Sequence, residues 1–339
     1  MLQDAAVRQE SSPATRRKLT QLFSRDEIRM LTRRSDLMGF AAVGFTWGVI
    51  ALAFAAMAWA SGQAPALAVP VFLLAIALIA GRQLALAILM HDASHGTLFR
   101  HRWLNEVFAD WVCARPIWND LKKYRSHHLA HHARTGQADD PDLSLVAPFP
   151  TTRASLARKL LRDLSGLTGA KFFIGRFLMD AGYLRWTVAN ERVRLPADGQ
   201  TFASRGLLFL RNATPTLITN ALLFGLLWTA GHAWLYLAWV VAYMTPFAAF
   251  VRIRSMAEHA CTENVADNFL NTRTTRAGWI ARATVAPINV NYHIEHHVMA
   301  SVPYFRLPLM HRMLRERNAT GAPPGYLEVL RIVSSRRAA

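Results

Sequence analysis

Histidine is the residue of this sequence whose spacing most clearly indicates chemistry. Nine of the thirteen histidines form one pair, two His-x-x-His-His groups and one single residue. These candidate metal ligands are His91, His95, His128, His131, His132, His259, His293, His296 and His297. Residues three and four positions apart share one helix face, so each group directs its imidazoles to one place. Nine convergent imidazoles exceed what one ion can use, and we predict two metal ions with open positions for oxygen. We favour iron because redox work is expected of such a site, and zinc cannot perform it.

Carboxylates beside the histidine groups are candidates for the outer contacts of this metal site. Ligating histidines generally donate their second ring nitrogen to a carboxylate or a carbonyl. We predict this role for Asp92, Asp140 and Glu295, and Glu258 and Asp142 are further candidates. The alternative for each of them is a solvated surface charge.

Four histidines stand outside the pattern. His127 faces about 100° away from its neighbour on a helix, so we expect it to contact a ligand from outside or to face solvent. His101 and His311 lie among arginines and are predicted to be surface residues. His232 falls in a short turn between two apolar segments, on the other side of the membrane from the metal site.

Long apolar segments are the elements that must position these histidines. Of the 339 residues, 52% are hydrophobic, and the net charge is +17. The predicted membrane spans are 37–60, 64–90, 213–230 and 233–250. Each is close to the roughly 20 residues needed to cross a bilayer, and short connections join them into two antiparallel hairpins of helices. Four buried helices of a soluble protein would each need a polar face, and a soluble nucleic-acid binder is not expected to be this apolar.

Charge indicates which ends of the spans face the cytoplasm. The connections 61–63 and 231–232 carry no charged residue, whereas nearly all 39 basic residues lie in the tail 1–36 and in 91–205 and 252–339. Basic loops stay on the cytoplasmic side. We therefore predict an all-α integral membrane protein with four transmembrane helices and a helical cytoplasmic cap that holds the metal site.

Arginine outnumbers lysine, which suggests a bacterial chain and thus the inner membrane. The whole chain, 1–339, is predicted to be one domain.

Three smaller features complete the prediction. The segment 155–165 is amphipathic, and it suits either a helix on an anionic membrane surface or packing against the cap. The two cysteines lie far apart, which indicates neither a disulfide framework nor a thiolate metal site. The charged N-terminus has no short apolar region with a cleavage site, so a cleaved signal peptide is not expected.

The histidines form three boxes, namely His91 and His95, then His128, His131 and His132, and finally His293, His296 and His297. These boxes and their separations resemble the membrane fatty acid desaturase superfamily, which also includes hydroxylases and ketolases. The stretch 291–308 and the string Asp140-Pro141-Asp142 strengthen the resemblance, which covers nearly the whole chain. It implies a four-helix membrane stem, a cap with a di-iron centre, O2 as co-substrate and a lipid-like substrate. It also implies electrons from ferredoxin or cytochrome b5, and this donor must be a separate protein because no His-Pro-Gly-Gly haem motif is present.

Details of the histidine boxes indicate which branch of the superfamily the chain resembles, and they leave the type of reaction open. Three residues separate His91 from His95, as in acyl-lipid desaturases, and the third box begins with His293 rather than the glutamine of front-end types. Ser255 stands where the family often has asparagine. We predict a lipid desaturase. The nearest alternative is a hydroxylase or ketolase acting on a carotenoid, a sphingolipid or another small substrate. A histidine-rich metal transporter is a weaker alternative, because its ligands would lie within the spans.

Overall fold

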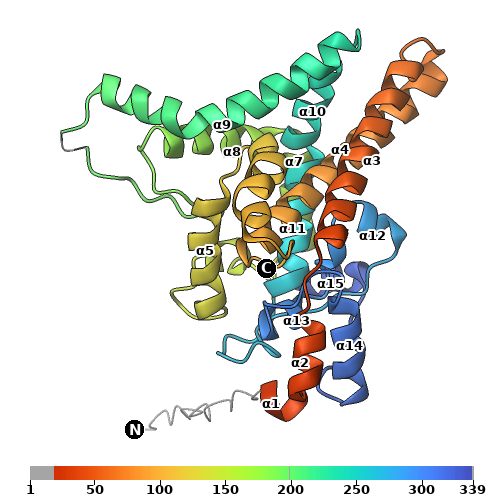
Figure 1. The fold of residues 1–339 in the computed structure, drawn as a ribbon, viewed down its shortest axis with the longest axis vertical. Helices are drawn as coiled ribbons and strands as arrows, with labels where there is room; N and C mark the ends of the chain where they lie inside the picture. Colours follow the sequence, from red (N-terminus) through yellow and green to blue (C-terminus); the bar gives the residue numbers. More distant parts are fainter. Residues whose placement is uncertain (1–18, 198, 338–339) are drawn as a thin grey trace.

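The computed structural model describes residues 19–197 and 199–337, and over these residues the chain is helical without a β-strand (Figure 1). The all-α prediction is confirmed. The helices of the first half are α1 (Leu19–Leu22), α2 (Arg25–Leu31), α3 (Asp36–Ala60), α4 (Pro65–Ser94), α5 (Leu121–Arg134), α6 (Leu143–Val146), α7 (Arg153–Leu164) and α8 (Leu167–Asp180). Those of the second half are α9 (Phe202–Thr229), α10 (Leu235–Met244), α11 (Pro246–His259), α12 (Trp279–Ala283), α13 (His293–Val298), α14 (Leu307–Glu316) and α15 (Tyr326–Val333). Short π and 3-10 turns, η1 (Leu104–Phe108), η2 (Asp110–Ala114) and η3 (Arg115–Ile117), follow α4, and η4 (Pro287–Asn289) precedes α13.

Helices α3 and α4 form a long antiparallel pair, and they match the first two predicted spans. The Ser35 hydroxyl caps α3 by accepting from the Met38 backbone N–H (3.3 Å), and Pro65 begins α4, where its missing N–H costs nothing. Helix α4 continues past the predicted end, so the first histidine box lies in its last turn and its C-cap.

The charge inside the second predicted span has a structural partner. Arg82 is buried in α4 and donates to the carbonyls of Arg282 (2.9 Å) and Ala283 (3.0 Å) at the end of α12. The neighbouring Gly81 leaves no room for a side chain, because a Cβ there would lie 2.0 Å from the Ala283 oxygen. The guanidinium thus satisfies the last carbonyls of a helix that packs tightly on α4.

The fourth predicted span, 233–250, corresponds to α10 and the first part of α11. The helix breaks at Thr245 (φ −115°, ψ −87°), where the following Pro246 has no N–H to continue the ladder. Beyond the break, α11 runs on to His259, so the single histidine is reached without leaving the helix. Three segments of the described chain are long and apolar enough to cross a membrane, namely Arg25–Ala60, Pro65–Ser94 and Leu235–His259.

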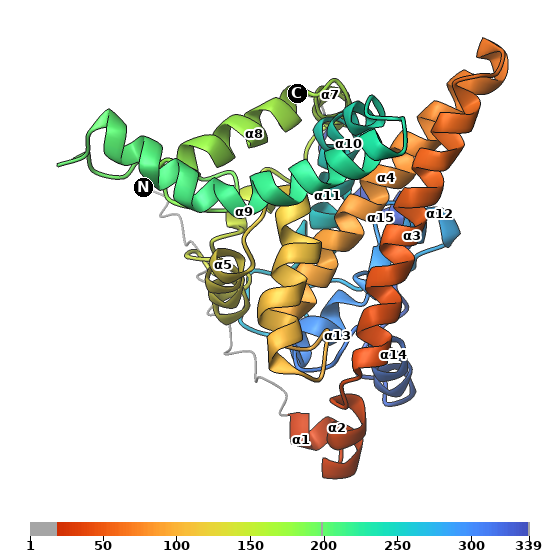
Figure 2. The ribbon, with the colours of Figure 1, turned by 45° about the horizontal axis from the view of Figure 1, so that its top comes forward.

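The third predicted span, 213–230, is only the second part of the longer helix α9. Pro215 and several asparagines and threonines dilute its apolar character, and it is not among those three segments. Figure 2 shows α9 lying alongside α8 and crossing toward α10 rather than running parallel to α3 and α4 along its whole length. Many of its apolar side chains are exposed, including those of Leu207, Leu222 and Trp228.

The end of the molecule that carries α13 and α14 is held together by two small hydrophobic clusters. In one, Phe23 and Leu31 from the N-terminal helices pack against α14, so the described part of the predicted tail 1–36 is docked on the cap. In the other, α7 and α15 pack on the end of α11. The predicted amphipathic segment is α7, which buries Leu156 there and exposes Leu161 and Leu164.

Candidate metal centre

Four helices, α4, α5, α11 and α13, bring all nine predicted histidines to one place. Helix α4 contributes the first box, α5 the second, the end of α11 the single histidine, and α13 the third box. Their candidate ligand atoms form three sets. The first set, called the first group below, consists of His91, His95, His128, His132 and His296. The other two sets, His131, His259 and His297 and then Glu258, His259 and His293, share His259, and together they are called the second group.

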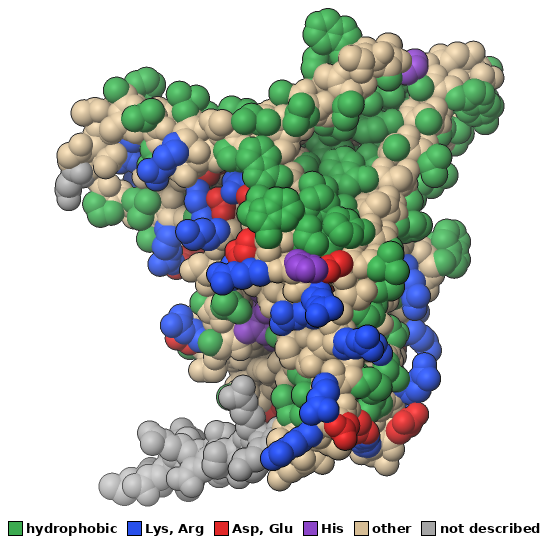
Figure 3. Space-filling model, in the orientation of Figure 1, with side chains coloured by type: hydrophobic (Ala, Val, Ile, Leu, Met, Phe, Trp, Pro, Cys, Tyr) green, Lys and Arg blue, Asp and Glu red, His purple; other side chains and the backbone are tan. Residues whose placement is uncertain are grey.

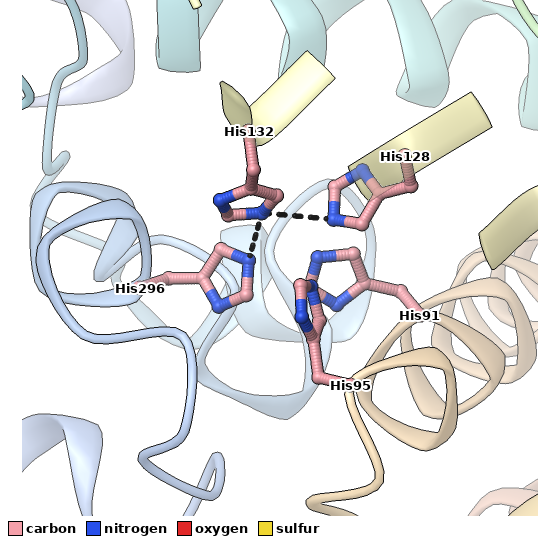
Figure 4. A group of neighbouring side chains, drawn as sticks. All are labelled: His91, His95, His128, His132 and His296. Atoms are coloured by element: carbon pink, nitrogen blue, oxygen red, sulfur yellow. Dashed lines mark hydrogen bonds between the residues drawn. The ribbon is translucent and has the colours of Figure 1, made fainter. Parts of the chain in front are cut away.

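Figure 4 shows the five side chains of the first group pointing toward a common centre. The Nε2 atom of His132 lies 3.0 Å from that of His128 and 3.0 Å from that of His296. One ring nitrogen carries either one proton or one lone pair, so hydrogen bonding does not account for both contacts equally well. Lone pairs directed at one cation account for all of them.

The second group lies directly against the first. The rings of His132 and His297 stack with centroids 4.1 Å apart, which joins the two groups. Within the second group, the Nε2 atoms of His259 and His293 are 2.8 Å apart, and Glu258 Oε1 lies 3.6 Å from His293 Nδ1. The arrangement therefore has two adjacent centres rather than one.

Unsatisfied nitrogens show that the two groups fit metal ions. His91 Nε2, His95 Nε2, His297 Nε2 and His293 Nδ1 are buried and have no hydrogen-bond partner among the described residues. Leaving one buried polar atom without a partner is costly, and several facing one volume call for a shared ligand. Burial, followed by repulsion from neighbouring histidines, holds the pKa values of His128, His296 and His297 well below the ordinary range. Their imidazoles are thus neutral, which is the form that binds a metal.

Two of the three predicted carboxylates touch histidines of the groups. His91 Nδ1 donates to Asp92 Oδ1 (2.9 Å), and His131 Nδ1 donates to Asp140 Oδ1 (2.8 Å). These bonds leave the Nε2 atom of each ring directed at the centre. Burial alone would lower the pKa of His131, but the hydrogen bond to Asp140 and the nearby carboxylate charges raise it.

The third carboxylate, Glu295, has different neighbours. It is fully buried, and it accepts from Thr274 Oγ1 (2.6 Å) and from His311 Nδ1 (2.6 Å) rather than from a histidine of the two groups. The prediction that His311 is a surface residue is wrong, because only 17% of its side chain is exposed. A signal was present in the sequence. His311 follows Leu307 by four residues, which places it on the buried face of α14.

The remaining histidines lie outside both groups. His127 donates to Asp142 (2.8 Å) and is therefore an outer contact of the second box rather than a solvent-facing residue. His101 is exposed, as predicted, and pairs with Asp36 (2.6 Å). His232 lies in the turn between α9 and α10.

A His127→Ala variant is expected to retain its bound metal and most of its activity. His127 contacts the carboxylate of Asp142, and the backbone N–H of Asp142 donates to Asp140 Oδ1 without any help from His127. The loss should be smaller than the roughly tenfold effect of removing a direct partner of a ligand. Metal analysis of the purified variant checks this, and loss of metal would place His127 among the ligands.

The sequence model of the fatty acid desaturase family matches residues 64–327, which include all nine histidines. The chain belongs to this family. It is accordingly an oxidoreductase, and it is a membrane protein with apolar helices and clustered histidines.

Curated relatives of this desaturase are named for different substrates. Dihydrorhizobitoxine desaturase of Bradyrhizobium elkanii is 26% identical over 91% of this chain and 82% of its own length. An sn-1 oleoyl-lipid 12-desaturase of Anabaena variabilis is 23% identical over 67% of this chain, and a human sphingolipid delta(4)-desaturase/C4-monooxygenase is 29% identical over 68%. The match covers 63% and 62% of these last two proteins, less than two thirds of either.

A cavity of about 650 Å³ opens onto the histidines of this desaturase. His128, His131, His259 and His293 form part of its wall. Apolar side chains from α4, α8, α10 and α11 line much of the rest, namely Leu84, Met90, Phe172, Met179, Tyr243, Phe247 and Val251. Its volume is within the range of small-molecule sites, so a substrate can lie beside the two histidine groups.

Proposed function

We propose that this protein binds two iron ions and uses O2 to introduce a double bond into the acyl chain of a lipid. The observation that carries the proposal is the convergence of nine histidines into two adjacent groups, in which the buried Nε2 atoms of His91, His95 and His297 lack a partner among the described residues. The first group would hold one iron, and the second, with Glu258 beside it, would hold the other. Imidazole suits iron, and iron supplies the one-electron and O2 chemistry that zinc lacks.

In this proposal the residues of the protein orient the metal ligands, hold the substrate and keep water away from it. Asp92 and Asp140 hold the rings of His91 and His131 so that each presents its Nε2 atom to the centre. The apolar wall of the cavity keeps water from the reacting carbon and holds a methylene next to the histidine groups. Since displacements near 1 Å matter for such reactions, this wall decides which C–H bond reacts.

The membrane arrangement is the second part of the proposal. We infer four crossings, made by α3, by α4, by the second part of α9, and by α10 together with the first part of α11. Figure 3 shows hydrophobic side chains gathered at the end where α3 meets α4 and α9 meets α10, while Lys and Arg gather toward the other end. By the positive-inside rule the histidine groups and the cap then face the cytoplasm, where a separate ferredoxin or cytochrome b5 can deliver electrons.

Hydroxylation is the second candidate reaction. Desaturation and hydroxylation begin with removal of hydrogen at the same kind of site, and the human relative is named for both a desaturase and a C4-monooxygenase activity. The metal-transporter alternative has no comparable support, because the chain belongs to a family of oxidoreductases.

Lipid analysis of cells that express the chain separates these outcomes. Cells with the wild-type chain are expected to accumulate a species lighter by two hydrogens, and cells with His296→Ala are not. A species heavier by one oxygen would establish the hydroxylase instead. Identical lipids and small metabolites in both cultures would contradict the proposal.

A further inference from the structure

The cavity beside the histidines contains a cation without a counter-charge. Arg176 of α8 forms part of the cavity wall, and its Nη1 atom is buried without a hydrogen-bond partner among the described residues. Its guanidinium lies 4.7 Å from the centre of the Trp186 ring, and this contact holds one face of the group without neutralising it. Arg176 as a whole is half-buried, but a buried nitrogen of a cation is costly unless it is paired.

The carboxylates near Arg176 are already engaged by other groups. Asp180 receives Trp118 Nε1 (3.0 Å) and lies 3.5 Å from Lys123 Nζ. Asp120 pairs with Arg115 (3.1 Å) and accepts from the Lys123 backbone N–H (2.9 Å). Neither carboxylate lies within ion-pair distance of the Arg176 guanidinium.

The cavity as a whole has an excess of unpaired cations. Its four carboxylates, Asp140, Asp142, Glu191 and Glu258, each pair with a histidine or an arginine. Arg176 and four more lining cations have no carboxylate within 4.0 Å in the described parts of the chain, these four being Lys159, Arg162, Lys171 and Arg192. Arg162, Lys171 and Arg192 are exposed to solvent, and of the five cations Arg176 is the one with a buried nitrogen that lacks a partner. Such a cavity attracts an anion, and its apolar wall accepts a hydrocarbon chain.

We propose that this cavity takes an amphiphilic substrate with an anionic group, and that Arg176 binds that group. The inference rests on the proposed function, because it treats the cavity as the substrate chamber. Helix α8, which carries Arg176, lies beside α9 and away from α13 in Figures 1 and 2. With its anionic group on Arg176, the substrate would extend its hydrocarbon along the apolar wall toward the histidines that also line the cavity. A planar guanidinium pairs with carboxylate and with phosphate, and either group satisfies the site.

Calorimetric titration of the full-length, iron-loaded protein in detergent tests the proposal without turnover, since no reductant is present. The probes are decanoate, decyl phosphate and the neutral decanamide. The wild-type protein is expected to bind at least one of the two anions about tenfold more tightly than decanamide, as a charge-assisted hydrogen bond implies. A preference for decanoate indicates a free-acid substrate, and a preference for decyl phosphate indicates a phosphate headgroup.

Two variants assign the preference to one residue. Arg176→Met is expected to abolish the preference for anions and to leave decanamide binding unchanged. Arg158→Met removes the same charge from the exposed face of α7, outside the cavity, and should keep the preference. Arg176→Lys retains the charge without the planar guanidinium and should keep part of the preference for anions. This variant supplies the test if the methionine variant does not fold.

Thermal unfolding provides a second readout. Because a cation with an unpaired buried nitrogen contributes little to folding, Arg176→Met is expected to melt no lower than Arg158→Met. Equal binding of all three probes to the wild-type protein, no binding of any probe, or an unchanged preference in Arg176→Met would overturn the proposal. None of these results bears on iron content or turnover, which test the proposed function separately.

Discussion

A His296→Ala variant is expected to lose bound iron and all turnover. His296 belongs to the first histidine group, where its Nε2 lies 3.0 Å from His132 Nε2 and its ring centroid lies 4.4 Å from that of His91. Alanine removes one converging nitrogen and leaves the others without a complete ligand set. Elemental analysis of the purified protein should fall from two irons per chain to one or fewer.

The matched control is His101→Ala. His101 is a histidine too, but it pairs with the carboxylate of Asp36, 73% of its side chain is exposed, and it lies outside both groups. This variant should keep both irons and full turnover. Two irons in His296→Ala would show that the first group does not bind metal.

Changing Asp140 to asparagine is expected to lower iron affinity or activity about 10- to 100-fold, the usual effect of losing an outer partner of a ligand. Asp140 accepts the His131 Nδ1 proton (2.8 Å) and also the backbone N–H groups of Asp142 (2.9 Å) and Gly136 (3.2 Å). Asparagine has the same shape, but it carries no charge and only one oxygen. The amide oxygen is a weaker acceptor than the carboxylate, so the His131 ring is held less firmly with its Nε2 free for the metal.

Asp139→Asn is the control for this prediction. The neighbouring Asp139 is 66% exposed and pairs only with Arg134 at the surface (3.2 Å), where an ion pair contributes little. Iron content and turnover of the two variants, measured side by side, separate the specific effect from a general loss of charge in this loop. Equal behaviour of both variants would contradict the role of Asp140.

Local periodicity allowed the sequence to predict much of the site. Spacings of three and four place histidines on one helix face whatever the rest of the fold does, so each box was recognisable by itself. Asp92 adjoins its histidine in sequence, and Asp140 follows the second box by eight residues, so both contacts are short-range. The helices at 37–60, 64–90 and 233–250 follow from predominantly apolar character for the same local reason.

The course of α9 is a case in which local character was insufficient. Its second part is apolar enough to suggest a span at 213–230, yet the helix begins at Phe202 and lies along α8 for part of its length. Which surface a mixed helix covers depends on the neighbours that accept it. Those neighbours come from distant parts of the chain.

The sequence by itself determined that this protein has clustered imidazoles, long apolar helices and carboxylates beside the boxes, because each is a property of a short stretch of chain. Only the tertiary structure decided how the histidines divide. His131 and His132 are adjacent in the sequence, but they face different groups because their side chains point about 100° apart on α5. Packing also decided that His311 holds Glu295 and that Arg176 is left without a carboxylate inside the cavity. These contacts join helices far apart in the chain, so no pattern of neighbouring residues encodes them.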